Sequence, residues 1–377
     1  MPRVFFLFFF RLTVIIDISE SFCHGRDGRR KNTHCSTSHG NLRQKTFFGE
    51  KMKNLRNIIA GALCAALAIT AGCAGNQKTY SIYDGSSAWT EEVTAQKAEV
   101  CVYDVSYEKG KESGITFTPS EESKMQTTLQ KTTENGEDVF LFTVEIAIKG
   151  SYVYTENGEE KTREINDRSI TKCWFLSAQN RFLPLKSTVE NDSIYPYQSK
   201  SGYSFAHMAY SSLTTYDKSK NKATAVITAT EGVEDNGIKS STRTYDKYNN
   251  SYFDNAQTMF LIRLADYEEG FYASYNSISI LDGKSNSLKI AVDSSKPTDS
   301  IDLPECIIKG VKRGTGNPFN VFNVQISLSG TFSGTPIKFA VDSGDNGAKR
   351  IIKTGYVFAK NFGNIWFTLK EANFKTL

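Results

Sequence analysis

The sequence has few histidines and few cysteines, and this scarcity limits the chemistry open to it. Its 377 residues include four histidines and seven cysteines. His24, His34 and His39 lie in the first 51 residues, so the rest of the chain has only His207. Any Ser-His-Asp or Cys-His mechanism there would need His207. Its neighbours, Tyr203 to Tyr210, alternate as in a strand, which favours a structural histidine.

Short motifs for catalysis, phosphates and metals are also missing. There is no Gly-x-Ser-x-Gly nucleophile elbow, and Ile278 stands where a phosphate-binding loop ending at Gly283 would need its first glycine. The turn from Asp342 to Gly347 lacks ligands that a calcium loop requires. Cys35 and His39 are only a weak match to zinc spacing. We therefore predict no metal site and no cofactor, and the sequence identifies no catalytic residue.

Positive charge is concentrated at the N-terminus. Residues 1–72 contain eleven Lys or Arg and four Asp or Glu, whereas the remainder contains 34 and 37. Nucleic-acid binding relies on clustered cations that displace counterions from phosphates. We therefore expect no nucleic-acid partner for the mildly acidic body.

An export signal begins at Met52. Lys53 and Arg56 form a short cationic region, and an apolar run from Ile58 ends in small residues before Cys73. This ending resembles the lipobox of bacterial lipoproteins, which implies a diacylglycerol on Cys73 as the mature N-terminus. We expect a lipid anchor in the cell envelope, on the outer membrane or the outer face of the cytoplasmic membrane. A transmembrane anchor or an ordinary secretion signal is the alternative, although roughly 16 apolar residues are fewer than the ~20 of a spanning helix.

This signal divides the chain into four predicted parts. Residues 1–51 are a leader that is disordered, or untranslated because synthesis starts at Met52. Residues 52–73 are the lipoprotein signal peptide, and residues 74–97 are a polar, flexible tether. Residues 98–377 form the β domain.

Alternating apolar residues predict a mainly β fold with antiparallel sheets. From Asp138 to Lys149 every second residue is apolar, and Phe322 to Leu328 repeats the pattern. Asn-Gly pairs at 135–136, 157–158, 236–237 and 346–347 predict tight hairpins. Further strands are expected at 99–107, 151–155, 170–176, 222–230, 239–245, 271–281, 287–292, 336–341, 349–359 and 364–369.

One central helix is predicted at residues 255–266. Asp254 can cap its first turn, and Met259, Phe260 and Leu264 make an apolar stripe. The helix either accompanies one barrel-like sheet or joins two lobes of curved sheet, 98–252 and 267–377. For Arg263 we favour a buried cation paired with a carboxylate over a ligand contact.

The cysteines of the body give no redox or zinc motif. Cys101, Cys173 and Cys306 are widely spaced and odd in number, so at most one intramolecular disulfide can form. Each lies in a strand-like context, and we expect buried free thiols.

The order of elements resembles an exported bacterial family known only as a domain of unknown function. The resemblance rests on the strand Val102 to Tyr107 with Gly110 and Gly114 after it, on Asp254 to Arg263, and on the segments 336–342 and 363–369. It implies an antiparallel, barrel-like β fold over about residues 98–371 and supplies no site residues.

Two classes of function are consistent with these patterns. The first is a noncatalytic lipoprotein that binds an apolar or amphipathic ligand, such as a lipid, or an envelope protein, because curved antiparallel sheets can enclose ligands. The alternative is a cell-envelope hydrolase of glycan or ester bonds that uses carboxylates or His207.

Overall fold

The structure is a computed structural model, and it describes most of the β domain. All of the described residues belong to one compact unit. The predicted signal, Cys73 and most of the predicted tether lie outside them. The described residues are 88–111, 113–199, 202–246, 252–264, 272–279, 284–292, 306–308, 311–313, 321–329, 337–342, 351–359 and 362–376.

Strands dominate this part of the chain, which confirms the predicted fold class. After the short 3-10 helix η1 (Ala88–Glu92), the first half contains β1 (Lys97–Lys109), β2 (Ile115–Pro119), β3 (Lys124–Glu134), β4 (Glu137–Glu156), β5 (Glu159–Phe175), η2 (Ala178–Asn180), β6 (Pro184–Ser199), β7 (Gly202–Asp217), β8 (Lys222–Ala229) and β9 (Ser241–Asp246). The second half contains β10 (Tyr252–Asp254), η3 (Asn255–Gln257), α3 (Thr258–Leu261), β11 (Tyr272–Ser279), β12 (Lys284–Val292), β13 (Cys306–Ile308), β14 (Val311–Arg313), β15 (Val321–Ser329), β16 (Ile337–Asp342), β17 (Ile352–Ala359) and β18 (Gly363–Thr376).

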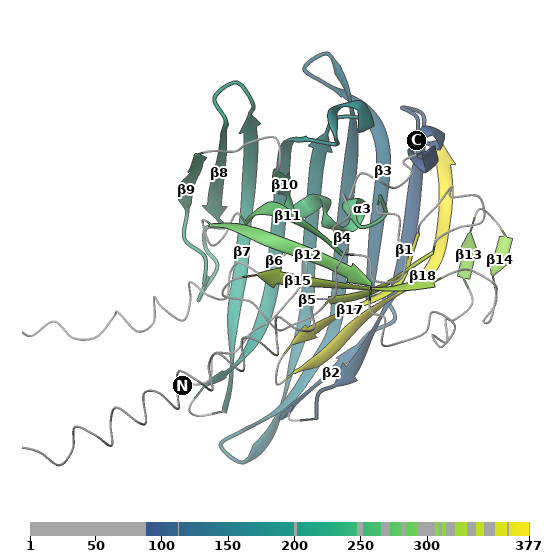
Figure 1. The fold of residues 1–377 in the computed structure, drawn as a ribbon. Helices are drawn as coiled ribbons and strands as arrows, with labels where there is room; N and C mark the ends of the chain where they lie inside the picture. The colour runs from purple at the N-terminus through teal and green to yellow at the C-terminus, as the bar shows by residue number, and fades with distance from the viewer. Residues whose placement is uncertain are drawn as a thin grey trace, which may run out of the picture. The chain divides into compact units, whose positions relative to one another are not determined.

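The strands form one sheet that joins both halves of the chain (Figure 1). From β9 the pairings run through β8, β7, β6, β5, β4 and β3 to β1. There β1 pairs with β18, and the sheet continues through β17, β16, β15, β12 and β11 to β10. Pairing is antiparallel except at β10–β11 and β13–β18.

The two ends of this sheet approach one another. Ile278 on β11 packs against Tyr216, Ala223 and Tyr245 on β7, β8 and β9. Strand β10 also contacts β6. The sheet therefore curves back so that β10 and β11 lie against the strands β6 to β9.

Two of the predicted Asn-Gly hairpins are confirmed. Asn135-Gly136 and Asn157-Gly158 have positive φ angles and connect β3 to β4 and β4 to β5. The prediction at Asn236-Gly237 is wrong, because Asn236 forms a parallel bridge with His207 and neither residue of the pair has positive φ. The pair 346–347 lies outside the described residues.

Strand β4 is longer than predicted, because it passes through Gly150 without a break. The strands expected on either side of this glycine are one strand of 20 residues. Gly150 has φ +148°, and a Cβ there would lie 2.1 Å from the carbonyl oxygen of Thr118. Glycine thus lets β2 pair closely with the middle of β4.

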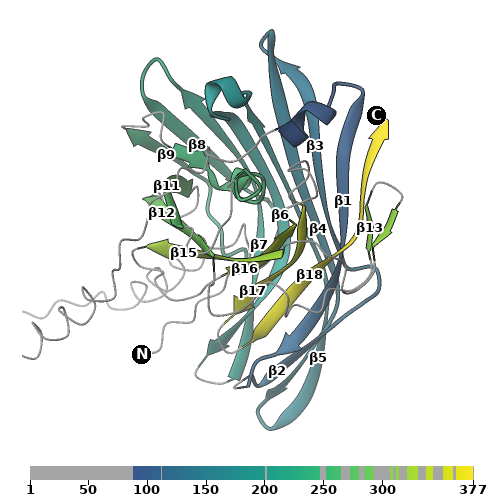
Figure 2. The ribbon, with the colours of Figure 1, turned by 45° about the vertical axis from the view of Figure 1, so that its right-hand side comes forward.

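The central helix is shorter than predicted and lies on one face of the sheet (Figure 1, Figure 2). It consists of η3 and α3, with residues 265–266 outside the described part. Asp254 caps it as predicted: its Oδ1 accepts from the N–H of Ala256 at 2.8 Å, while Gln257 Oε1 accepts from the N–H of Asp254. All four residues of α3 are buried.

Candidate functional site

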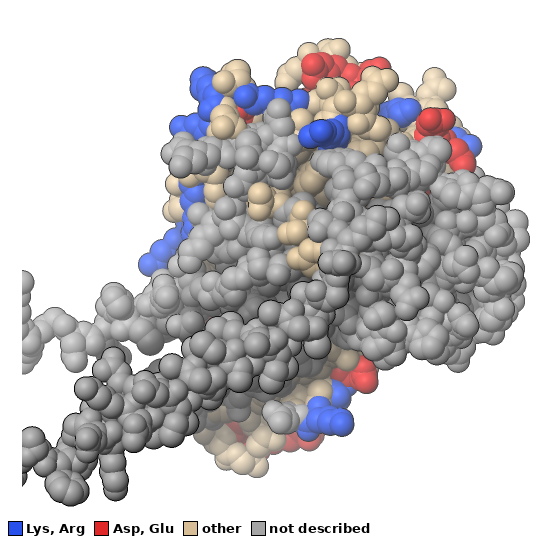
Figure 3. Space-filling view, in the orientation of Figure 1, with Lys and Arg blue, Asp and Glu red and all other residues tan. Residues whose placement is uncertain are grey.

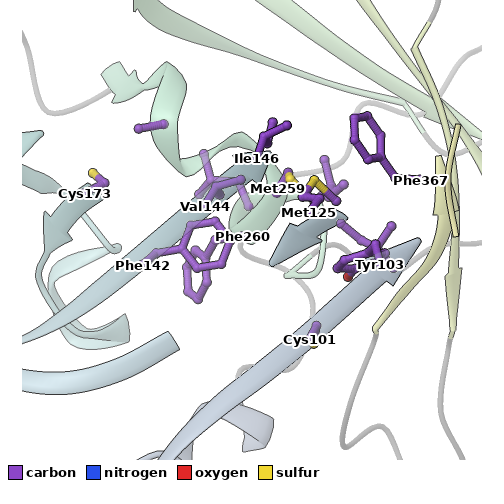
Figure 4. Packing of buried hydrophobic residues seen from close by; sticks show 14 of the residues in the cluster. Cys101, Tyr103, Met125, Phe142, Val144, Ile146, Cys173, Met259, Phe260 and Phe367 are labelled. Atoms are coloured by element: carbon purple, nitrogen blue, oxygen red, sulfur yellow. The ribbon is translucent and has the colours of Figure 1, made fainter. Parts of the chain in front are cut away.

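The face of the sheet that carries η3 and α3, here called the inner face, is apolar over β1, β3, β4 and β18. Side chains alternate along a strand, so each of these strands presents one set of residues to the helix. Figure 4 shows part of this packing, including the labelled Phe142, Val144 and Ile146 of β4 close to Met259 and Phe260. The inward-facing residues include Cys101, Tyr103, Met125, Leu129, Phe142, Val144, Ile146, Ile148, Ile365, Phe367 and Leu369, all buried.

Phe260 of α3 is the centre of a cluster of aromatic rings. It is fully buried. Its ring centroid lies 4.6 Å from that of Phe175, 5.1 Å from Phe182, 6.2 Å from Phe142 and 6.5 Å from Phe140. These contacts attach the helix to β4, β5 and the segment before β6.

One ion pair is buried within this apolar region. The Arg263 guanidinium donates from Nη1 to Glu99 Oε1 at 2.7 Å and from Nη2 to Glu99 Oε2 at 3.0 Å, with side-chain exposures of 4% and 2%. The predicted pairing of Arg263 with a carboxylate is therefore confirmed. This bidentate geometry offsets the desolvation of both charges and holds the end of the helix against β1.

The cysteines of the apolar region are buried free thiols, as predicted for Cys101 and Cys173. Burial raises the pKa of Cys101 to about 12, and the Glu99 carboxylate adds to the rise. Burial also raises the pKa of Cys173 well above its usual value. Neither thiol is activated as a nucleophile. Cys306 begins β13, and its side chain is outside the described part.

Over β5, β6 and β7 the inner face has both polar and apolar residues. Asp254 is fully buried, and its Oδ2 accepts from the hydroxyls of Ser187 and Tyr216, both at 2.5 Å. Burial raises the pKa of Asp254, while these hydrogen bonds act against the rise. The capping carboxylate thus ties the start of the helix to β6 and β7.

Among the residues that the structure describes, four hydroxyls on the same face have no partner. The oxygen atoms of Ser169, Thr171, Ser212 and Thr214 are buried and make no hydrogen bond. Buried hydroxyls are nearly always paired, so such a group marks a place where water or a ligand completes the site. We call these four residues the hydroxyl patch.

His207 lies on the opposite, outer face. Its Nε2 is 2.5 Å from Asp192 Oδ1, and the two side chains are 28% and 69% exposed. In the described part of the chain, His207 has no hydrogen bond to a serine or cysteine. A histidine and a carboxylate without a nucleophile can orient or exchange a proton, but they do not form a hydrolytic triad.

Charge on the visible described surface is mixed rather than of one sign (Figure 3). Lys161 pairs with Glu156 at 2.7 Å and Lys186 with Glu134 at 2.7 Å, and Lys149 also pairs with Glu122. Exposed pairs of this kind contribute little stability. They do not mark a site for a ligand of one charge.

No family model, curated protein or solved structure matches the chain. The resemblance to an exported family therefore stays a prediction. Among the described residues there is no group of three or more metal-ligating side chains, and no helix is long and apolar enough to cross a membrane.

The residues of the candidate site were missed at the sequence level. The segment from Ser187 to Ser193 has serine or asparagine at three of its four inward positions, so it lacks an apolar alternation. The sequence does have a signal for this strand: small polar residues alternate from Ser187 to Ser193, between the strand expected at 170–176 and the alternating residues 203–210. Cys73, the predicted lipidation site, lies outside the described residues.

Proposed function

We propose that the chain is a lipid-anchored protein of the cell envelope whose β domain binds an amphipathic ligand without catalysis. The sheet would enclose the ligand in a barrel-like manner, with the tether of residues 74–97 connecting it to the membrane. One observation carries this proposal: a single curved inner face combines an apolar region with buried hydroxyls that have no partner.

The physical argument is one of complementarity. An apolar surface removed from water stabilises a bound tail, at about 25 cal/mol per Å² of buried area. A hydroxyl both donates and accepts a hydrogen bond, so it can pair with a polar head group. A ligand with both parts would pair its head group with the hydroxyls and lay its tail on apolar residues near them, such as Val189 and Met208. A purely apolar ligand would leave the hydroxyls unpaired.

The anchor is tested separately from the ligand. We expect Cys73→Ala to abolish lipidation, so that the protein is released from the membrane fraction and its processed mass loses the diacylglycerol. Cys64→Ala, within the same signal, is the matched control and should leave both properties unchanged. Unchanged membrane retention and mass in Cys73→Ala would contradict the anchor.

The ligand is tested by native mass spectrometry of the mature protein, beginning at Cys73, purified from a bacterial envelope without detergent exchange. We expect a complex with one small molecule, released and identified on denaturation. Apo protein in every preparation, together with a crosslinked partner in intact envelopes, would instead favour binding of an envelope protein.

The contact between His207 and Asp192 supports a second candidate, a hydrolase of glycan or ester bonds. The pair could act as a general base on the outer face. Turnover of an ester or glycan substrate that is lost in a folded His207→Ala variant would favour the hydrolase over the carrier. Asp138→Asn, on the exposed start of β4, is a suitable control.

A further inference from the structure

The hydroxyl patch lies on two strands that flank β6. Ser169 and Thr171 belong to β5, and Ser212 and Thr214 belong to β7. Thr171, Ser212 and Thr214 are 1%, 6% and 0% exposed, and the oxygen of Ser169 is also buried. The patch is therefore part of the interior.

Strand register places the four oxygens around one residue of β6. Val189 pairs with Thr171 on one side and with Ser212 on the other. Residues two apart on a strand are about 7 Å apart, and strands two apart in a sheet are about 10 Å apart. Ser169 is in register with Asn191, and Thr214 is in register with Ser187, so these two lie on opposite sides of Val189 along the strands. The patch is thus a slanted strip about 14 Å long and about 10 Å wide, which is the length of two sugar rings.

The polar neighbours of the patch are already engaged. Ser187 donates to Asp254, and the Asn191 amide donates to Ser193 Oγ at 2.9 Å and to the carbonyl oxygen of Met208 at 2.5 Å. The hydrogen-bond donors of Ser187 and Asn191 are therefore not available to the four hydroxyls. A buried hydroxyl without a partner is costly, so an occupant that offers both donors and acceptors is favoured at this place.

The charge around the patch indicates what the occupant is. The patch has no ionised side chain of its own, and the nearby carboxylates already accept hydrogen bonds: Asp254 from Ser187, and Asp167 from the N–H of Ile194 at 2.8 Å. A charged head group would be buried without a counter-ion, which is strongly unfavourable. An uncharged head group with several hydroxyls has no such penalty.

An apolar cluster begins at Val189, in the centre of the patch, and extends to β8. Val189, Met208, Tyr210 and Ile227 are buried together, on β6, β7 and β8. A tail could lie against this cluster while the head group contacts the hydroxyls.

We propose that the hydroxyl patch binds the uncharged, polyhydroxyl head group of an amphipathic ligand, such as a neutral glycolipid. This inference rests on the proposed ligand-binding function and specifies its ligand class. Thr171 and Thr214 are the specificity-determining residues, and the tail binds to the apolar cluster of Val189, Met208, Tyr210 and Ile227.

The test compares two eight-carbon amphiphiles with different head groups. Binding of octyl maltoside, below its critical micelle concentration, and of octanoate to residues 74–377 is measured by isothermal titration calorimetry. We expect octyl maltoside, whose head group has two sugar rings, to bind more tightly. Thr171→Val and Thr214→Val keep the side-chain shape, and each should raise the Kd for octyl maltoside about threefold to tenfold while leaving that for octanoate unchanged.

Thr215→Val is the matched control, because Thr215 is exposed on the same strand. It should change neither Kd. Without ligand, Thr171→Val and Thr214→Val should raise the Tm, since each removes an unpaired buried hydroxyl. This increase also demonstrates that the variants fold.

Each other result has a defined meaning. Octyl maltoside binding that is unaffected by both variants overturns the assignment of the patch but leaves the proposed function intact. Tighter binding of octanoate than of octyl maltoside has the same meaning. Failure of the wild-type protein to bind either amphiphile contradicts the proposed function itself. If the four hydroxyls bind only ordered water, neither variant will change the binding of the sugar amphiphile.

Discussion

The inner face of the sheet changes character between β4 and β5. On β4, Phe142, Val144 and Ile146 are buried against the helix. Their partners on β5 are Cys173, Thr171 and Ser169, of which two are hydroxyl residues without a hydrogen bond. At these positions the inward residues of β4 are apolar, whereas two of the three residues that pair with them on β5 are polar.

The apolar region of the inner face stabilises the fold, whereas the hydroxyls of β5 and β7 are available for binding. Over β1, β3 and β4 the interior is filled by α3, and the buried pair of Arg263 with Glu99 makes two hydrogen bonds. Over β5 and β7 the interior contains donors and acceptors that the fold does not use. We therefore expect substitutions in the apolar region to change stability and substitutions in the polar region to change recognition.

The largest effect should follow from Phe260→Ala. This change removes a fully buried ring from contact with four others, so the free energy of unfolding should fall by about 3–5 kcal/mol. Urea denaturation followed by circular dichroism measures it. Leu213→Ala, at an outer position that is 43% exposed, should change stability by about 0.5 kcal/mol or less. Equal effects at the two positions would contradict the assignment of the core to the helix.

Arg263→Met should have the next largest effect. It leaves Glu99 buried without a counter-ion, and the free energy of unfolding should fall by about 3 kcal/mol. The double variant Glu99→Leu with Arg263→Met should regain part of this loss, because no charge then remains buried. Strict additivity of the two single changes in a double-mutant cycle would show that the pair is not coupled.

The smallest effect should come from the polar side of the boundary, at Asp254. Its folded-state pKa is raised from the usual 3.8, mainly by burial. The folded protein therefore binds this proton more tightly than the unfolded chain does. The contribution to stability is fully present below pH 3.8 and falls as the pH rises through the folded-state pKa.

Asp254→Asn keeps the helix cap and removes the titration, so this decrease with pH should disappear. Asp254→Ala removes the cap as well and should lower stability by about 1–2 kcal/mol across the range. Unfolding curves between pH 3 and pH 8 distinguish the two variants. An unchanged pH profile in Asp254→Asn would show that another group causes the dependence.

Sequence reasoning succeeded where burial is apolar. Asp138 to Lys149 alternates clearly because every inward residue is hydrophobic, and Asn135 and Asn157 mark turns that require positive φ. The cap at Asp254 and the buried pair of Arg263 were also predicted. In each case a local chemical preference agrees with the tertiary structure.

Sequence reasoning failed where inward residues are polar and where a residue contacts a segment far away in the sequence. Strand β6 was not predicted, because Ser187, Asn191 and Ser193 face inward and give no hydrophobic period. Gly150 was taken as a break between strands, because its close contact with Thr118 depends on β2, which was also not predicted. The Asn236-Gly237 pair was misjudged, because Asn236 instead binds the backbone of Ala209 through its side chain.

The pairing of β1 with β18 bears on how the chain folds as it is made. Their ladder joins Lys97–Lys109 to Gly363–Thr376, segments separated by about two thirds of the chain. Synthesis proceeds at about 5–20 residues per second, so one edge of β1 lacks its partner for tens of seconds. Contacts this distant in sequence also slow folding. The nascent chain therefore presents an unpaired edge that a chaperone can hold, and a truncation before residue 363 would leave that edge open permanently.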